Sequence, residues 1–141
     1  MIVPDINLLV YAYNDGAPHH VAARQWWETL INGQERVGVP WVVSTGFVRL
    51  MTHARALTVP MLPAEAVDCV MEWFRYPHVT PVNPGAEHLI HFRRNLDTAG
   101  AGANLVTDAH IAALAIEYQA EVHSNDTDFT RFPGLRWRNP L

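Results

Sequence analysis

The apolar positions of the chain follow two spacings, which predict short strands separated by helices. Apolar residues recur at helical spacing in several segments that begin near a proline and end near a glycine or a second proline. Between these segments lie short runs rich in β-branched residues, which are typical of buried strands. The expected strands cover residues 2–5, 36–39, 78–82, 121–124 and 135–137, and the expected helices cover residues 6–13, 18–32, 40–51, 63–74, 84–96 and 105–118.

Three of these boundaries depend on particular residues. Pro18 and Pro84 are expected to begin helices, because proline is favoured in the first helical turn. The glycine-rich run at 100–103 predicts a flexible break, and Asn104 is expected to cap the helix that follows.

This order of elements predicts an α/β fold. Strands that alternate with helices form βαβ units, so we expect a short parallel β-sheet flanked by helices on both faces. The chain has 141 residues, a typical length for one domain, so a single domain covering 1–141 is expected. In open parallel sheets, ligands bind at the carboxyl ends of the strands.

The composition is that of an ordinary globular protein, with 49% hydrophobic and 17% charged residues. No stretch approaches the roughly 20 apolar residues of a membrane span, so a cytoplasmic protein without membrane contact is expected. The one cysteine, Cys69, has no partner for an internal disulfide.

The charge balance limits the contacts that the chain can make with nucleic acid. A net charge of −4 excludes a protein that coats nucleic acid by charge alone, because such binding normally requires a basic excess. A localised site is still allowed. All ten basic residues are arginine, which binds phosphate through two parallel hydrogen bonds. Arg49, Arg93 and Arg94 are candidates for contacts with nucleic-acid phosphates.

Four aspartates stand where a strand is followed by a helix, or in the first turn of a helix: Asp5, Asp108, Asp126 and Asp128. Each alone is explained as a cap or turn residue. A parallel sheet would bring them together, and two carboxylates about 4 Å apart repel by roughly 4 kcal/mol at an effective dielectric constant near 20. Such a cluster requires a cation, and ligands that are all oxygen favour Mg²⁺ or Mn²⁺ over zinc. These ions promote phosphodiester hydrolysis, so the pattern predicts a metal-dependent nuclease.

The eight histidines are the alternative metal ligands. His88 and His91 share one face of a predicted helix, but no HExxH motif or paired cysteine accompanies them. We therefore expect exposed helix histidines and no zinc site. His110 is two residues from Asp108 on a helix and is expected to point away from it.

Three motifs of the chain resemble those of PIN domains. Residues 4–12 (PDINLLVYA) resemble the opening D-x-N motif, and residues 104–115 (NLVTDAHIAALA) resemble the central aspartate helix. Residues 124–129 (SNDTDF) resemble the final D-x-D-F segment. The closing FPGL at 132–135 is similar to the tail of VapC-type toxins, so the resemblance spans nearly the whole chain.

The resemblance implies an endoribonuclease toxin that hydrolyses RNA with Mg²⁺, for which Mn²⁺ can substitute. Asp5 and Asp108 would be the principal catalytic metal ligands, and Asp126 and Asp128 would complete the site. Asn7 would orient Asp5. Which of the last two aspartates points inward is left open, because residues two apart share a face in a strand but not in a helical turn. The resemblance also implies inhibition by a VapB-type antitoxin, and a homodimer or a larger toxin–antitoxin assembly.

One position departs from the family pattern. PIN domains usually carry a glutamate on the helix after the second strand, and this chain has Gly46 there. Ser44, Thr45 or a water would have to fill the gap, so one metal or two is left open. The main alternative is therefore a catalytically weak or inactive PIN-like scaffold that binds RNA or an antitoxin without cutting. A receiver-like phosphoacceptor domain requires a lysine, and the chain has none.

Overall fold

Five short parallel strands form the centre of the structure, in the spatial order β3-β2-β1-β4-β5. The computed structural model describes residues 1–100 and 102–141. Its strands are β1 (Ile2–Pro4), β2 (Val37–Pro40), β3 (Val79–Val82), β4 (Glu121–His123) and β5 (Arg136–Arg138).

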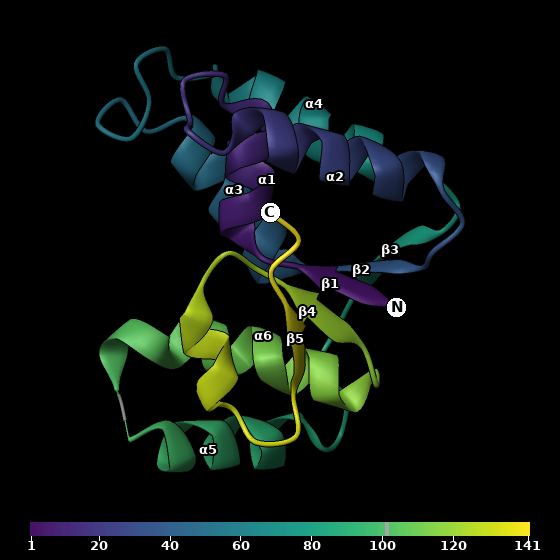
Figure 1. Cartoon of the computed structure of the whole chain (residues 1–141), viewed down its shortest axis with the longest axis vertical. Helices are drawn as coiled ribbons and strands as arrows, with labels where there is room; N and C mark the ends of the chain where they lie inside the picture. Colours follow the sequence, from purple (N-terminus) through teal and green to yellow (C-terminus); the bar gives the residue numbers. More distant parts are fainter. Residues whose placement is uncertain (101) are drawn as a thin grey trace.

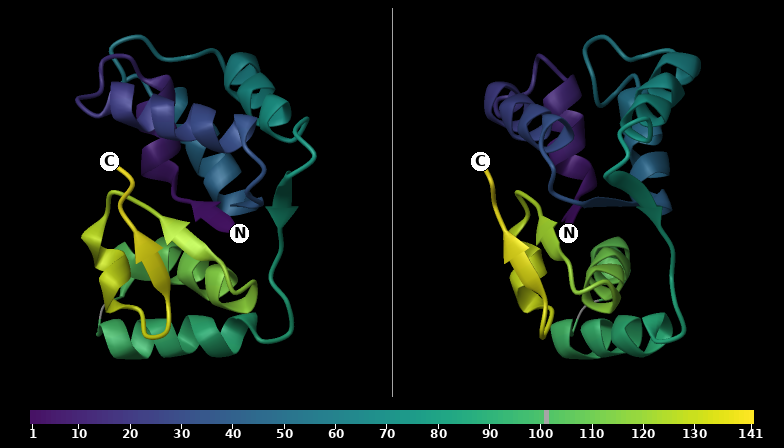
Figure 2. Two further views of the ribbon diagram at one scale, coloured as in Figure 1. Left: turned by 45° about the vertical axis from the view of Figure 1, so that its right-hand side comes forward. Right: turned by 90° about the vertical axis from the view of Figure 1, so that its right-hand side faces the viewer.

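Helices cover both faces of this sheet (Figure 1). One face carries α1 (Ile6–Tyr13), α2 (His20–Asn32), α3 (Trp41–Met51) and α4 (Pro63–Trp73). The other face carries α5 (His88–Ala99) and α6 (Val106–Glu117), which pack against each other (Figure 2). Two short 3₁₀ helices complete the described elements, η1 (Ala103–Leu105) and η2 (Thr127–Arg131). The expected α/β fold with a parallel sheet between two helical layers is confirmed.

The central strands are apolar along their length because helices bury them on both sides. Val37 and Val39 in β2 and Val3 in β1 have no exposed surface. The largest group of buried side chains lies beneath α1–α4, where Phe47 and Trp73 contact edge to face with ring centroids 4.8 Å apart. This packing fixes α3 and α4 over the sheet.

The register of β1 and β4 brings two distant parts of the chain together at one edge of the sheet. Pro4 lies opposite His123, and the Asp5 backbone N–H donates to the His123 carbonyl at 2.9 Å. The chain after β1 and the chain after β4 therefore leave the sheet side by side.

The fifth helix begins four residues later than expected. We predicted a start at Pro84, but α5 begins at His88. Gly85 is held instead by α6, since its N–H donates to a Glu117 carboxylate oxygen at 3.1 Å. A Cβ on Gly85 would lie 2.7 Å from Glu117 Oε1, so a larger residue would displace this carboxylate. That tertiary contact delays the helix. The second helix likewise begins at His20, two residues after Pro18.

The expected cap at Asn104 is also wrong. Asn104 lies inside η1, and α6 begins after Leu105 with no side-chain cap bond. Within the glycine-rich run, Gly100 ends α5 with φ +61°, a conformation that favours glycine. Ala101, at the middle of the predicted break, lies outside the described residues. No helix among the described residues is long and apolar enough to cross a membrane.

Candidate active site

Each of the four aspartates lies where the chain leaves a strand or enters a helix, as expected. Asp5 follows β1 and is the N-cap of α1, with its Oδ1 accepting the Ile6 N–H at 2.7 Å. Asp126 follows β4 and is the N-cap of η2, and Asp128 lies in the first turn of η2. Asp108 lies in the first turn of α6. Because β1 and β4 are neighbours, the four carboxylates gather at one edge of the sheet.

Ser124 connects three parts of this cluster through its hydroxyl. The Ser124 Oγ donates to Asp5 Oδ2 at 2.6 Å and accepts the Asp126 backbone N–H at 2.9 Å. It also accepts from Asn7 Nδ2 at 3.2 Å. Ser124 and Asp5 are both buried, so the position of the Asp5 carboxylate is determined by this hydroxyl and the Ile6 N–H.

The electrostatics of the cluster favour protonated carboxyl groups when no cation is bound. Burial raises the pKa of Asp5 to about 6, and the nearby charge of Asp126 adds to this increase. Burial also raises the pKa of Asp108 to about 7, and the charges of Asp5, Asp126 and Asp128 add to it. Aspartates with ordinary surroundings ionise near pH 4. With no cation bound, part of the cluster is therefore protonated near neutral pH.

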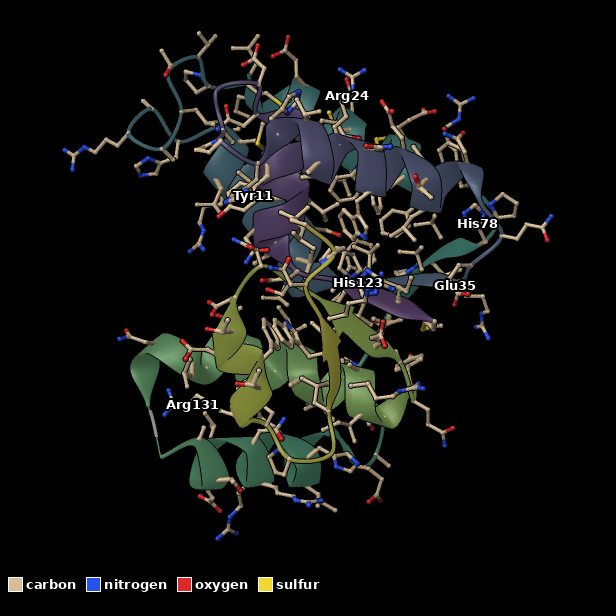
Figure 3. All side chains as sticks on the ribbon, viewed as in Figure 1. Tyr11, Arg24, Glu35, His78, His123 and Arg131 are labelled. Carbon is tan, nitrogen blue, oxygen red and sulfur yellow. The ribbon has the colours of Figure 1, made fainter. Side chains whose placement is uncertain are left out.

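Asp126 is the member of the D-x-D pair that is joined to Asp5 through Ser124, because its backbone N–H donates to the Ser124 Oγ that also bonds Asp5. Its charge acts on both Asp5 and Asp108, whereas that of Asp128 acts on Asp108. The Asp128 carboxylate is instead paired with Arg131 at 3.4 Å. Arg131 also donates to the Ala99 carbonyl at 2.5 Å, and it therefore joins η2 to the end of α5 (Figure 3).

Asn7 was expected to orient Asp5, and it is connected to Asp5 through the Ser124 hydroxyl. Asn7 makes its hydrogen bond to Ser124 and not to Asp5. It also faces Asn125, whose N–H is 3.5 Å from Asn7 Oδ1. Sequence reasoning missed Ser124, although its place two residues before Asp126 and directly after a buried strand was a usable signal.

Ser44 and Thr45, the residues expected to replace the missing glutamate, both line an apolar pocket beside α4, and Thr45 also lines a pocket with Ile6 and Thr107. Ser44 does not face the carboxylates: it is buried towards α4, in an apolar pocket with Val67 and Val70. Thr45 is exposed, and its hydroxyl donates to the Trp41 carbonyl at 2.9 Å. Gly46 is buried against α1, where a Cβ would lie 2.6 Å from Ile6 Cδ1.

The three candidate phosphate ligands lie in different places. Arg49 borders a small pocket that also contains Ile6 and Thr107, the chain neighbours of Asp5 and Asp108. Arg93 and Arg94 lie on the exposed surface of α5, and Arg93 is 3.5 Å from the carboxylate of Asp97. Only Arg49 among the three is therefore adjacent to the carboxylate cluster.

The prediction that the helix histidines are exposed is wrong for His88. His88 was expected to be exposed, but it is buried, with its Nε2 2.9 Å from His110 Nδ1 and its Nδ1 3.4 Å from Glu117. His110 turns towards His88 and away from Asp108, as expected, and burial lowers its pKa. These contacts join α5 to α6.

The donor set of the cluster fits a hard divalent cation. All the carboxylates offer oxygen, the donor type that hard divalent cations prefer. Among residues 1–100 and 102–141, however, no three His, Cys, Asp or Glu side chains are arranged to hold one ion. Mg²⁺ usually keeps several waters and uses one or two protein carboxylates, so this arrangement is compatible with it.

Comparison with known proteins defines the class of the chain. A model of the PIN domain family matches residues 2–135. The chain therefore belongs to the PIN-domain family, in agreement with the fold and with the aspartates at the ends of β1 and β4.

Two relatives match over nearly their whole lengths. Ribonuclease VapC33 of Mycobacterium tuberculosis is 45% identical over 141 residues, which cover 100% of this chain and 99% of that protein. Ribonuclease VapC37 of the same organism is 41% identical over 140 residues, which cover 99% and 97%. Within the PIN-domain family, the chain is thus of the VapC type.

Solved structures have the same fold. VapBC2 from Rickettsia felis, bound to a DNA fragment from its promoter, matches with a TM-score of 0.69 and 19% identity, covering 99% of this chain and 98% of that chain. Mycobacterium tuberculosis VapC20, a Sarcin-Ricin loop cleaving toxin, matches with a TM-score of 0.69 and 16% identity, covering 96% and 99%.

Proposed function

We propose that this protein is a metal-dependent endoribonuclease toxin that hydrolyses RNA phosphodiester bonds at the carboxylate cluster of Asp5, Asp108 and Asp126. The observation that carries the proposal is the convergence of these buried or half-buried carboxylates, with raised pKa values, at one edge of a parallel sheet. Full-length relatives at 45% and 41% identity carry the name ribonuclease, which supports RNA as the substrate.

Mg²⁺, with Mn²⁺ as a substitute, is the cofactor that the oxygen ligands favour. When bound, it would supply the charge that polarises the phosphodiester and lowers the pKa of the attacking water. Asp5 and Asp108 would be its principal ligands through their carboxylate oxygens, and Asp126 would complete the site through waters on the ion. Ser124 keeps the Asp5 carboxylate in one orientation by donating to Oδ2. Asp128, paired with Arg131, would contribute less directly.

A VapB-type antitoxin is the partner that we propose, and it would inhibit the enzyme. Among the fold neighbours are VapBC2 from Rickettsia felis and a toxin–antitoxin complex from Klebsiella pneumoniae. We also expect a homodimer or a larger toxin–antitoxin assembly, a single domain over 1–141, and a cytoplasmic location. The exposed apolar side chains Trp41, Val67 and Met71 on α3 and α4 offer a surface for such contacts.

The second candidate is an inactive PIN-like scaffold, which Gly46 in place of the usual glutamate favours. One experiment separates the two. Purified protein is incubated with single-stranded RNA in EDTA, and Mg²⁺ or Mn²⁺ is then added in excess. We expect cleavage only after metal addition, and none from Asp5→Asn or Asp108→Asn protein at any metal concentration. Full activity in EDTA, or no cleavage by the folded wild-type protein in either metal, would contradict the proposal.

A further inference from the structure

A small pocket lies directly beside the carboxylate cluster. It has a volume of about 220 Å³ and is formed where the starts of α1 and α6 meet α3. Its lining residues are Ile6, Val42, Thr45, Gly46, Arg49 and Thr107. Because Ile6 follows Asp5 and Thr107 precedes Asp108, the pocket borders the site where RNA would be cut.

Gly46 lies directly against Ile6 in the wall of this pocket. A Cβ at position 46 would lie 2.6 Å from Ile6 Cδ1 and 3.2 Å from Ile6 Cγ1, so a side chain there would have to displace Ile6. The family glutamate expected near this position is absent. The pocket is therefore bordered by a cation and two hydroxyl-bearing residues, and no carboxylate lines it.

Arg49 differs from the other arginines near the site. It is exposed in the last turn of α3, and it forms no ion pair within the described part of the chain. Arg131, by contrast, is held by Asp128 and by the Ala99 carbonyl. Arg49 is therefore a free cation that borders a pocket next to a strongly anionic cluster.

We propose that this pocket binds a phosphate of the RNA next to the phosphodiester that is cut, with the Arg49 guanidinium donating to its non-bridging oxygens. The inference rests on the proposed function. An RNA strand that approaches four carboxylates is repelled, and an unpaired arginine beside them offsets that repulsion at a phosphate within its reach. The guanidinium fork suits two phosphate oxygens at once, and the exposed hydroxyl of Thr107 adds a further donor.

The test measures RNA binding separately from cleavage. Protein carrying Asp108→Asn, which prevents cutting, is titrated into a fluorescein-labelled single-stranded RNA in Mg²⁺ at several salt concentrations. Adding Arg49→Gln should weaken binding about tenfold, the effect of losing one charged hydrogen bond. It should also reduce the slope of log affinity against log salt by about 0.7, the value for one phosphate contact on a single strand. Arg49→Lys should restore the salt slope and only part of the affinity, because it keeps the charge without the fork.

Arg36→Gln is the matched control, because Arg36 is an exposed arginine before β2, at the opposite end of the sheet. It should leave both affinity and slope unchanged. If Arg36→Gln and Arg49→Gln weaken RNA binding equally, the effect comes from net charge alone, and the proposed phosphate subsite is contradicted. Unchanged binding of a folded Arg49→Gln protein, verified by circular dichroism, would also overturn it. Failure of the wild-type protein to cut RNA contradicts the proposed function instead, and the binding comparison still decides the role of Arg49.

Discussion

Ser124 is the residue on which the geometry of the cluster depends most directly. A serine hydroxyl can donate one hydrogen bond and accept two, and Ser124 uses all three. It donates to Asp5, and it accepts from Asn7 and from the backbone N–H of Asp126. One buried atom therefore sets the relative positions of the segments that follow β1 and β4.

We predict that Ser124→Ala destabilises the protein by about 1–3 kcal/mol, because it leaves buried polar groups without their partner. Removing the hydroxyl that donates to Asp5 should also raise the pKa of Asp5 further, since that hydrogen bond lowers it. Urea unfolding and RNA cleavage measure the two consequences. Ser124→Thr keeps the hydroxyl and serves as the control. Full activity and stability in Ser124→Ala would mean that the hydroxyl does not position Asp5.

Gly46→Glu tests whether position 46 faces the carboxylates. The glutamate should tighten Mn²⁺ binding, measured by calorimetry, and should weaken RNA binding because it fills the pocket beside Arg49. Stability is a poor readout. A gain of up to roughly 1 kcal/mol in helix propensity opposes the cost of moving Ile6, which a Cβ would approach to 2.6 Å.

The matched control for this variant is Gly46→Gln, which has nearly the same size without the charge. It should weaken RNA binding and leave Mn²⁺ affinity unchanged. If a folded Gly46→Glu protein binds Mn²⁺ no more tightly than wild type, the side chain at this position is directed away from the aspartates.

At the scale of single elements, α3 presents successive residues to two different pockets. Ser44 and Thr45 line the apolar pocket beside α4, whereas Thr45 and Gly46 line the pocket at the start of α1. Successive helical residues are about 100° apart around the axis, so Ser44 and Gly46 lie on nearly opposite faces of α3. Ser44 and Gly46 therefore cannot substitute for each other at the active site.

Ser44→Ala is expected to stabilise the protein by about 1 kcal/mol. The Ser44 hydroxyl is buried, with no hydrogen-bond partner in the described part of the chain, and alanine removes this unsatisfied group. Alanine also has the higher helix propensity. Thermal unfolding measures the gain, and Mn²⁺ affinity should be unchanged. A loss of metal affinity on this substitution would show that Ser44 contributes to the site after all.

At the scale of the whole molecule, the carboxylate cluster couples stability to pH and to metal. The folded-state pKa values of Asp5 and Asp108, about 6 and about 7, are higher than the ordinary aspartate value of 3.8. The folded protein therefore binds these protons more tightly than the unfolded chain does. Their stabilising contribution is fully present below about pH 4 and is lost as pH rises through 6 and 7.

We therefore predict that, in EDTA, wild-type protein loses stability relative to Asp108→Asn as pH rises from 5 to 8. At pH 5 the wild-type Asp108 is protonated and neutral, so the two proteins should unfold at similar temperatures. At pH 8, Mn²⁺ should raise the unfolding temperature of wild type, because it binds the ionised carboxylates of the folded state. It should raise that of Asp108→Asn less. A constant difference between the two proteins across this pH range would contradict the coupling.

The sequence by itself predicted the order of strands and helices and the placement of four aspartates at strand ends and helix starts. These features are local: alternation of apolar residues, prolines near helix starts, and short polar residues after buried strands. They were sufficient for the fold class, for the cluster, and for the resemblance to PIN domains. The helix start at His88 was not predictable, because Gly85 is held by Glu117, 32 residues away.

Only the tertiary structure decided how the site is built. Ser124 reaches Asp5 across 119 positions of sequence, and the contact exists because β1 and β4 are neighbours in the sheet. The burial of His88 and the packing of Gly46 on Ile6 have the same origin. The direction of a side chain is set by the segments that pack against it. The local spacing of apolar and polar residues does not specify which distant segments these are.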